Sequence, residues 1–89
     1  MTRTEKLKYN EMLAKTWADD DCADYTRSVL LSMVHASQNP NHAEHAPLSP
    51  ETCRKWARIE RTSAVGFPPC REASDTLFAL ADKLYDLAE

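Results

Sequence analysis

The sequence predicts an all-α protein, a compact four-helix bundle formed by a single domain over residues 1–89. Apolar residues recur every three or four positions in four separate stretches, as on one face of a helix. No stretch alternates apolar and polar residues as a half-buried strand does. The only glycine is Gly66, so Gly-rich nucleotide-binding loops are excluded and tight hairpins are disfavoured.

Composition narrows the class of protein further. Hydrophobic residues make up 43% of the chain and charged residues 28%, which is ordinary for a globular protein. A formal net charge of -3 gives no global attraction to nucleic acid or to anionic membranes. No apolar run resembles a leader or a membrane span, so we expect a cytoplasmic protein without membrane contact. A protein with so small a core gains stability from association, so homodimer formation is one of the states that we consider.

The three cysteines argue against a disulfide framework. Cys22, Cys53 and Cys70 are odd in number, widely spaced and never arranged as C-x-x-C. We interpret them as small buried side chains, and we expect no cofactor.

The first helix is predicted over residues 4–17, with Thr2 or Thr4 as N-cap and Glu5 in the first turn. Its expected inward face consists of Tyr9, Met12, Leu13 and Trp17.

The second helix is predicted over residues 21–37, where apolar side chains cover more than half of the helical wheel. The acidic triplet Asp19 to Asp21 precedes it and is interpreted as N-terminal capping. A calcium loop would need staggered ligands and a central glycine, which this stretch lacks.

Residues 38–49 are predicted to form a loop rich in histidine and proline, because Pro40 and Pro47 interrupt the helical pattern. His42, Glu44 and His45 are of metal-ligand type, and a metal site or a pH-sensitive element is an alternative. The loop offers no defined scaffold for an ion, so we predict no metal site.

The third helix is predicted over residues 50–62, because Ser49, Pro50 and Glu51 form a strong helix start. Cys53, Trp56 and Ile59 are expected to face inward. Its basic residues form the best candidate for a functional surface, since they contribute 4 of the 11 in the chain: Arg54, Lys55, Arg58 and Arg61.

The fourth helix is predicted over residues 70–88, after a turn in which Gly66 caps the preceding helix and Phe67 enters the core. One face carries Ala73, Leu77, Leu80, Leu84 and Leu87, and the opposite face carries Glu72, Asp75, Asp82, Asp86 and Glu89. A second apolar ridge consists of Phe78, Ala81, Tyr85 and Ala88. This width exceeds what one neighbouring helix covers, so part of it is expected to meet another chain.

No catalytic motif is present, and we expect a protein that is not an enzyme. The pattern favours a protein-binding module, a small regulator or inhibitor of the kind that phages and mobile elements encode, acting by occluding a protein partner. The candidate partner-binding residues are Arg54, Lys55, Arg58, Arg61, Phe78 and Tyr85. The alternative is a small DNA-binding regulator that uses the basic face of residues 50–62. A further alternative is that the arginines pair with the acidic stripe of the last helix or simply form a solvated face.

Overall fold

Four α-helices make up the computed structural model, which describes residues 1–20 and 22–88. They are α1 (Arg3–Asp19), α2 (Asp24–Gln38), α3 (Pro50–Ser63) and α4 (Pro69–Ala81). No strand occurs in the described part of the chain, which confirms the predicted all-α four-helix bundle. Among these residues, no helix has both the length and the apolar character needed to cross a membrane.

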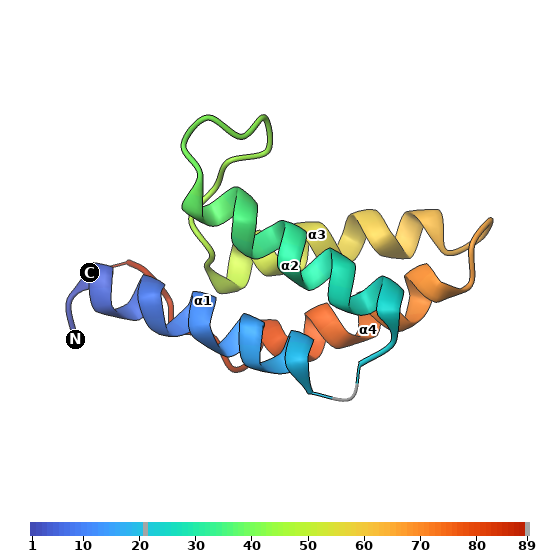
Figure 1. Ribbon diagram of the computed structural model, residues 1–89, viewed down its shortest axis with the longest axis horizontal. Helices are drawn as coiled ribbons and strands as arrows, with labels where there is room; N and C mark the ends of the chain where they lie inside the picture. Colours follow the sequence, from blue (N-terminus) through green and yellow to red (C-terminus); the bar gives the residue numbers. More distant parts are fainter. Residues whose placement is uncertain (21, 89) are drawn as a thin grey trace.

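The helices are arranged as two antiparallel pairs. α1 packs against α2, α3 runs along α4, and α2 also contacts α4 (Figure 1). All four contribute to one hydrophobic cluster, and the loop before α3 adds the fully buried Leu48. The largest apolar side chains of this core are Leu30, Met33, Val34, Leu48, Leu77 and Leu80.

The N-terminal start of α1 agrees with its prediction, and its inward face agrees in part, since Leu13 and Trp17 pack against the core as predicted. Thr2 and Glu5 form a reciprocal capping box at the helix start. The predicted inward residues Tyr9 and Met12 are 43% and 58% exposed. The fully buried residues of α1 are instead Asn10, Ala14 and Ala18, whose small side chains let α1 approach its neighbours closely.

The second helix begins at Asp24, so the predicted start at residue 21 is wrong. Asp20 caps the C-terminal end of α1 and does not cap α2, while Asp21 lies outside the described residues. Arg27 accounts for the break between the helices. Its guanidinium group donates to the carbonyl oxygens of Ala18, at 2.8 Å, and Cys22, at 3.3 Å, and it pairs with Asp24 at 3.2 Å. One cation therefore satisfies the C-terminal end of α1 and secures the chain that follows.

The fourth helix ends at Ala81, so its predicted extent to residue 88 is wrong. After this point the N–H of Lys83 donates to the carbonyl of Leu80, which is a turn rather than a helical bond. Residues 82–88, called the C-terminal segment below, then run beside α1 (Figure 1). Leu84 and Leu87 are nevertheless only 8% and 6% exposed. The leucine pattern predicted burial correctly although the backbone is not helical.

A buried side chain explains how the C-terminal segment leaves the helix. Asn10, which is fully buried, accepts a hydrogen bond from the N–H of Tyr85 at 2.8 Å and donates to its carbonyl at 2.9 Å. The same amide donates to the carbonyl of Leu48 at 2.9 Å. Asn10 thus supplies the hydrogen bonds that helix continuation would have given, and it joins α1 to both segments.

The turn between α3 and α4 also differs from its prediction. The C-cap of α3 is Ala64 in a right-handed conformation, so Gly66 is not the helix cap. Phe67 is 47% exposed and rests its ring edge-on against Tyr25, with 5.1 Å between the centroids. It covers the surface of α2 instead of entering the core.

Candidate partner-binding surface

The start of α3 holds the basic residues in fixed positions. The side chain of Ser49 accepts a hydrogen bond from the N–H of Thr52 at 3.1 Å, and Pro50 occupies the first turn, as predicted. Cys53 and Ala57 bury the opposite side of the helix against the core. α3 is therefore a firmly anchored element with one long exposed side.

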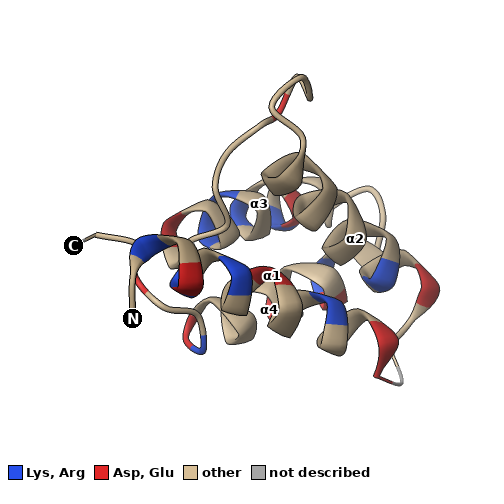
Figure 2. Cartoon of the chain, turned by 60° about the vertical axis from the view of Figure 1, so that its left-hand side comes forward, with Lys and Arg blue, Asp and Glu red and all other residues tan. Residues whose placement is uncertain are grey.

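Basic residues lie along α3 (Figure 2). Their four side chains divide into two pairs by what they contact. Arg54 pairs with Asp82, the first residue after α4, at 3.6 Å. The Arg61 guanidinium turns toward α4 and lies 5.2 Å from the centre of the Phe78 ring. Lys55 and Arg58 are exposed to solvent and have no carboxylate partner within residues 1–20 and 22–88. Among the described residues, Arg54 is thus the one basic residue of α3 that forms an ion pair with the acidic stripe predicted for the last helix.

Phe78 and Tyr85 do not form one ridge, because the helix that would have aligned them ends between them. Phe78 is half-buried beneath Arg61 and packs against the core. Tyr85 lies on the C-terminal segment, 42% exposed, and its ring meets that of Tyr9 edge-on with centroids 4.9 Å apart. Ala81, also placed on the predicted ridge, is 1% exposed and belongs to the core. Only Phe78 therefore adjoins the basic residues of α3.

A hollow lies where the first residues of α1, the start of α3 and the C-terminal segment meet. Its volume is about 670 Å³. We call it the arginine groove because three of its lining side chains are arginines. The lining residues are Arg3, Pro47, Ser49, Pro50, Glu51, Thr52, Arg54, Arg58, Asp86, Leu87 and Ala88. The groove places Arg54 and Arg58 beside a residue of α1 that the sequence did not suggest.

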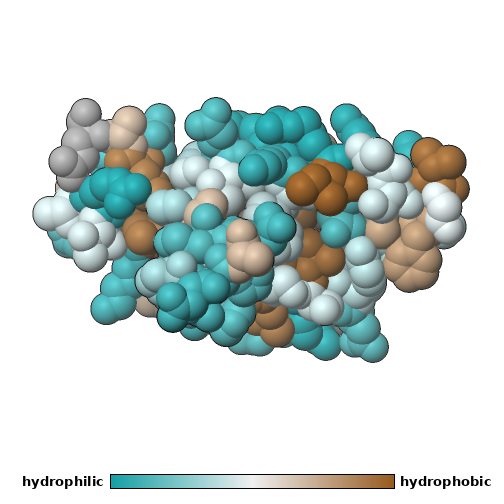
Figure 3. Space-filling view, turned by 90° about the horizontal axis from the view of Figure 1, so that it is seen from above, coloured by the Kyte–Doolittle hydropathy of each residue, from teal (hydrophilic) through white to brown (hydrophobic). Residues whose placement is uncertain are grey.

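A second hollow, of about 390 Å³, lies between α3 and residues 43–46 of the preceding loop. Lys55, Trp56 and Ile59 line its α3 side. Ile59 is 56% exposed, so its predicted inward position is wrong. Figure 3 shows isolated hydrophobic patches set in a largely polar face. α3 thus combines exposed cations with an exposed apolar side chain.

The histidine loop makes local contacts rather than a ligand cluster. The ring of His42 lies edge-on to that of His35, with centroids 5.5 Å apart, and its Nδ1 accepts from the N–H of Glu44 at 2.9 Å. The Nδ1 of His45 is 2.7 Å from the carbonyl oxygen of Ala36. No set of three or more His, Cys, Asp or Glu side chains within the described ranges is placed to hold a metal ion.

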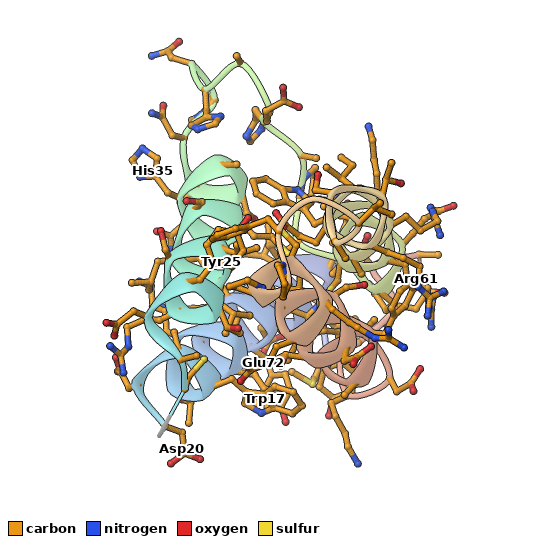
Figure 4. All side chains as sticks on the ribbon, turned by 90° about the vertical axis from the view of Figure 1, so that its right-hand side faces the viewer. Trp17, Asp20, Tyr25, His35, Arg61 and Glu72 are labelled. Carbon is orange, nitrogen blue, oxygen red and sulfur yellow. The ribbon has the colours of Figure 1, made fainter. Side chains whose placement is uncertain are left out.

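A hydrogen-bonded chain joins α2, α3 and α4, and no sequence pattern indicated it. The hydroxyl of Tyr25 donates to Glu60 at 2.7 Å and accepts from the thiol of Cys70 at 3.2 Å. These bonds raise the pKa of Tyr25 well above its usual value. Figure 4 shows Tyr25 toward the middle of the bundle and Arg61 at its outer edge. These hydrogen bonds connect the three helices on the inner side of α3, opposite its exposed side.

The cysteines are free and held in their neutral form. Burial raises the pKa of Cys22 and of Cys70, and it raises the pKa of Cys53 to about 12. Cys53 also directs its thiol to the carbonyl of Leu77 at 3.1 Å. Because the thiolate is the nucleophilic form, these environments suppress thiol reactivity.

Taken together, the geometry defines an all-helical bundle with one basic, partly apolar helix surface and a groove at its end. Comparison with known protein families, with curated proteins and with solved structures finds no match to this chain.

Proposed function

We propose that this protein is a non-catalytic module that binds an acidic surface of a protein partner through α3 and regulates that partner by occluding it. The observation that carries the proposal is the combination on one helix of exposed Lys55 and Arg58 with exposed Ile59. Cations orient an acidic partner and exclude others, while an apolar side chain beside a hollow supplies area that becomes buried on binding.

The DNA-binding alternative has weaker support. A recognition helix presents its cations to phosphates and base edges, whereas Arg54 and Arg61 are directed at Asp82 and Phe78. α3 also packs along α4, and the loop of residues 39–49 separates it from α2, far longer than the turn of a helix-turn-helix motif. The outer side of α3 is therefore better suited to a protein surface than to a major groove.

Capture from a lysate of the source cells tests the proposal. The protein is immobilised and the retained proteins are identified by mass spectrometry, for the unaltered chain and for a variant with Arg54→Glu, Arg58→Glu and Arg61→Glu. We expect the variant to lose a partner that the unaltered chain retains. A second variant, Lys55→Glu with Arg58→Glu, changes only exposed side chains and protects the test against misfolding, which circular dichroism monitors.

The matched control reverses two exposed charges on α1, with Lys8→Glu and Lys15→Glu, as many charges as the second variant changes, and it should retain the partner. Equal capture by all variants would reject the α3 surface. Titration of duplex DNA against salt tests the alternative, which requires an affinity that falls steeply as salt rises. Light scattering on the same preparations measures whether the protein is a monomer or a homodimer.

A further inference from the structure

The arginine groove has the size and the charge to receive part of a partner. Its volume of about 670 Å³ accommodates several side chains of an extended peptide. Arg54 and Arg58 are separated by one helical turn and both line it, and Arg3 reaches it from α1. A guanidinium group is planar and donates two parallel hydrogen bonds, a geometry that matches a carboxylate.

The molecule's own C-terminal segment illustrates what this region accepts. Asp82 already pairs with Arg54, and Asp86 lines the groove a few residues further along. The backbone between them is not helical, and Leu84 points into the core. A non-helical stretch of chain thus brings one carboxylate into contact with Arg54 and a second into the lining of the groove.

We infer that the arginine groove binds an acidic, extended peptide segment of the partner, with Arg54 and Arg58 pairing with its carboxylates and Asp86 competing for them. This inference rests on the proposed function, because it assigns the acidic part of the partner to one end of α3. Glu51 also lines the groove. Its carboxylate is in the first turn of α3, where the positive end of the helix dipole offsets its charge. Asp86 is exposed and not part of a helix, so it is the carboxylate whose removal should strengthen binding.

The test uses a short polyglutamate peptide with a fluorescent label, whose binding to the whole protein is followed by fluorescence anisotropy at low salt. Arg58→Gln should weaken binding about tenfold, the change expected for loss of a charge-assisted hydrogen bond. Asp86→Asn should strengthen binding about threefold, because one competing charge is removed from the groove. Both side chains are exposed, so neither substitution removes core packing.

Two control variants change the net charge by the same amount as the groove variants, but at positions distant from the arginine groove. Arg71→Gln removes a cation from the first turn of α4, next to the C-terminal end of α3 rather than its start. Asp19→Asn removes an anion from the far end of α1, about 24 Å along the helix axis from Arg3. We expect each control to change the affinity less than about twofold. A groove variant that behaves like its matched control would overturn the inference.

Nuclear magnetic resonance gives a second readout that is independent of affinity. Polyglutamate should shift the backbone amide signals of residues 51, 52, 87 and 88 in the unaltered protein, and shifts confined elsewhere would contradict the groove. Inorganic polyphosphate and duplex DNA are titrated in parallel, and tighter binding of either would reject an acidic peptide as the ligand class.

The outcomes separate this inference from the proposed function. If the groove variants match their controls while reversal of the α3 charges still abolishes partner capture, the groove is wrong and the proposed function stands. If the groove variants respond as expected while partner capture ignores the α3 charges, the peptide site stands and the proposed function is wrong.

Discussion

The side-chain amide of Asn10 binds both backbone polar groups of Tyr85, although 75 residues separate the two positions. A single fully buried side chain thereby fixes the C-terminal segment to α1, and through Leu48 it also fixes the loop that leads into α3. The wall of the arginine groove that contains Asp86 and Leu87 depends on this contact.

Replacement of Asn10 by alanine should destabilise the protein strongly. The carbonyl of Leu48 would be buried without its partner, which costs about 1–3 kcal/mol, and the part-buried N–H and carbonyl of Tyr85 would lose theirs at a smaller cost. We expect a loss of about 2–4 kcal/mol in the free energy of unfolding, measured by urea denaturation. Asn41→Ala, at an exposed loop position, serves as control and should change it by less than about 0.5 kcal/mol. A loss below about 1 kcal/mol for Asn10→Ala would mean that the amide does not hold the segment.

Ser37 is predicted to control the loop before α3. Its hydroxyl accepts from the N–H of the buried Leu48 at 3.0 Å and donates to Glu11 at 2.5 Å. Ser37→Ala should cost about 1–3 kcal/mol, because the N–H of Leu48 would be buried without a partner. It should also speed hydrogen exchange at the Leu48 amide. Ser32→Ala, at an exposed position of the same helix, should leave both measurements unchanged.

The leucine face of α4 should dominate stability. Leu77 is fully buried, so Leu77→Ala should lower the free energy of unfolding by about 2–5 kcal/mol, through lost burial and the cavity that remains. Leu31 is 42% exposed, and Leu31→Ala should cost less than about 1 kcal/mol. Similar losses in thermal or urea unfolding for the two variants would be incompatible with the described core.

Stability should decline in alkaline solution, in part because of Cys53. Burial raises the pKa of its thiol from 9.0 to about 12, so the folded state keeps a proton that the unfolded state releases. This contribution is fully present below pH 9 and is lost as the pH rises toward 12. The slope is up to about 1.4 kcal/mol per pH unit.

Urea denaturation of the unaltered protein and of Cys53→Ala, across this alkaline range, measures the contribution. The other groups with raised pKa values, among them Tyr25, are common to both proteins and cancel in the difference. The variant should show the shallower decline. Parallel curves would show that the Cys53 thiol is not protected by burial.

Hydrophobic spacing and capping residues predicted most of the fold. The start of α3 at Ser49 and Pro50 required only local chemistry, and the buried leucines of α4 followed from their spacing. The end of α4 depended on Asn10, whose partners are distant in the sequence and have no local signature. The start of α2 likewise depended on the contact of Arg27 with the Ala18 carbonyl.

The candidate site was predicted in part. Periodicity placed Arg54, Arg58 and Arg61 on one helix, but it could not show which of them contact α4. Ile59 was assigned to the core because of its side chain, whereas Ala57 occupies that side of the helix. The groove itself joins Arg3 to Ala88, positions that only the folded chain brings together.

Because Arg3 and Ala88 line the same groove, the order of the helices along the chain can be changed by circular permutation. A short linker between these two ends, with new termini cut between the exposed residues Ala43 and Glu44, would give a circular permutant that keeps every helix intact. Because Arg3 and Ala88 both line the groove, the linker would start and finish at its wall. Such a permutant would therefore retain the bundle while obstructing the entrance through which a peptide approaches Arg58.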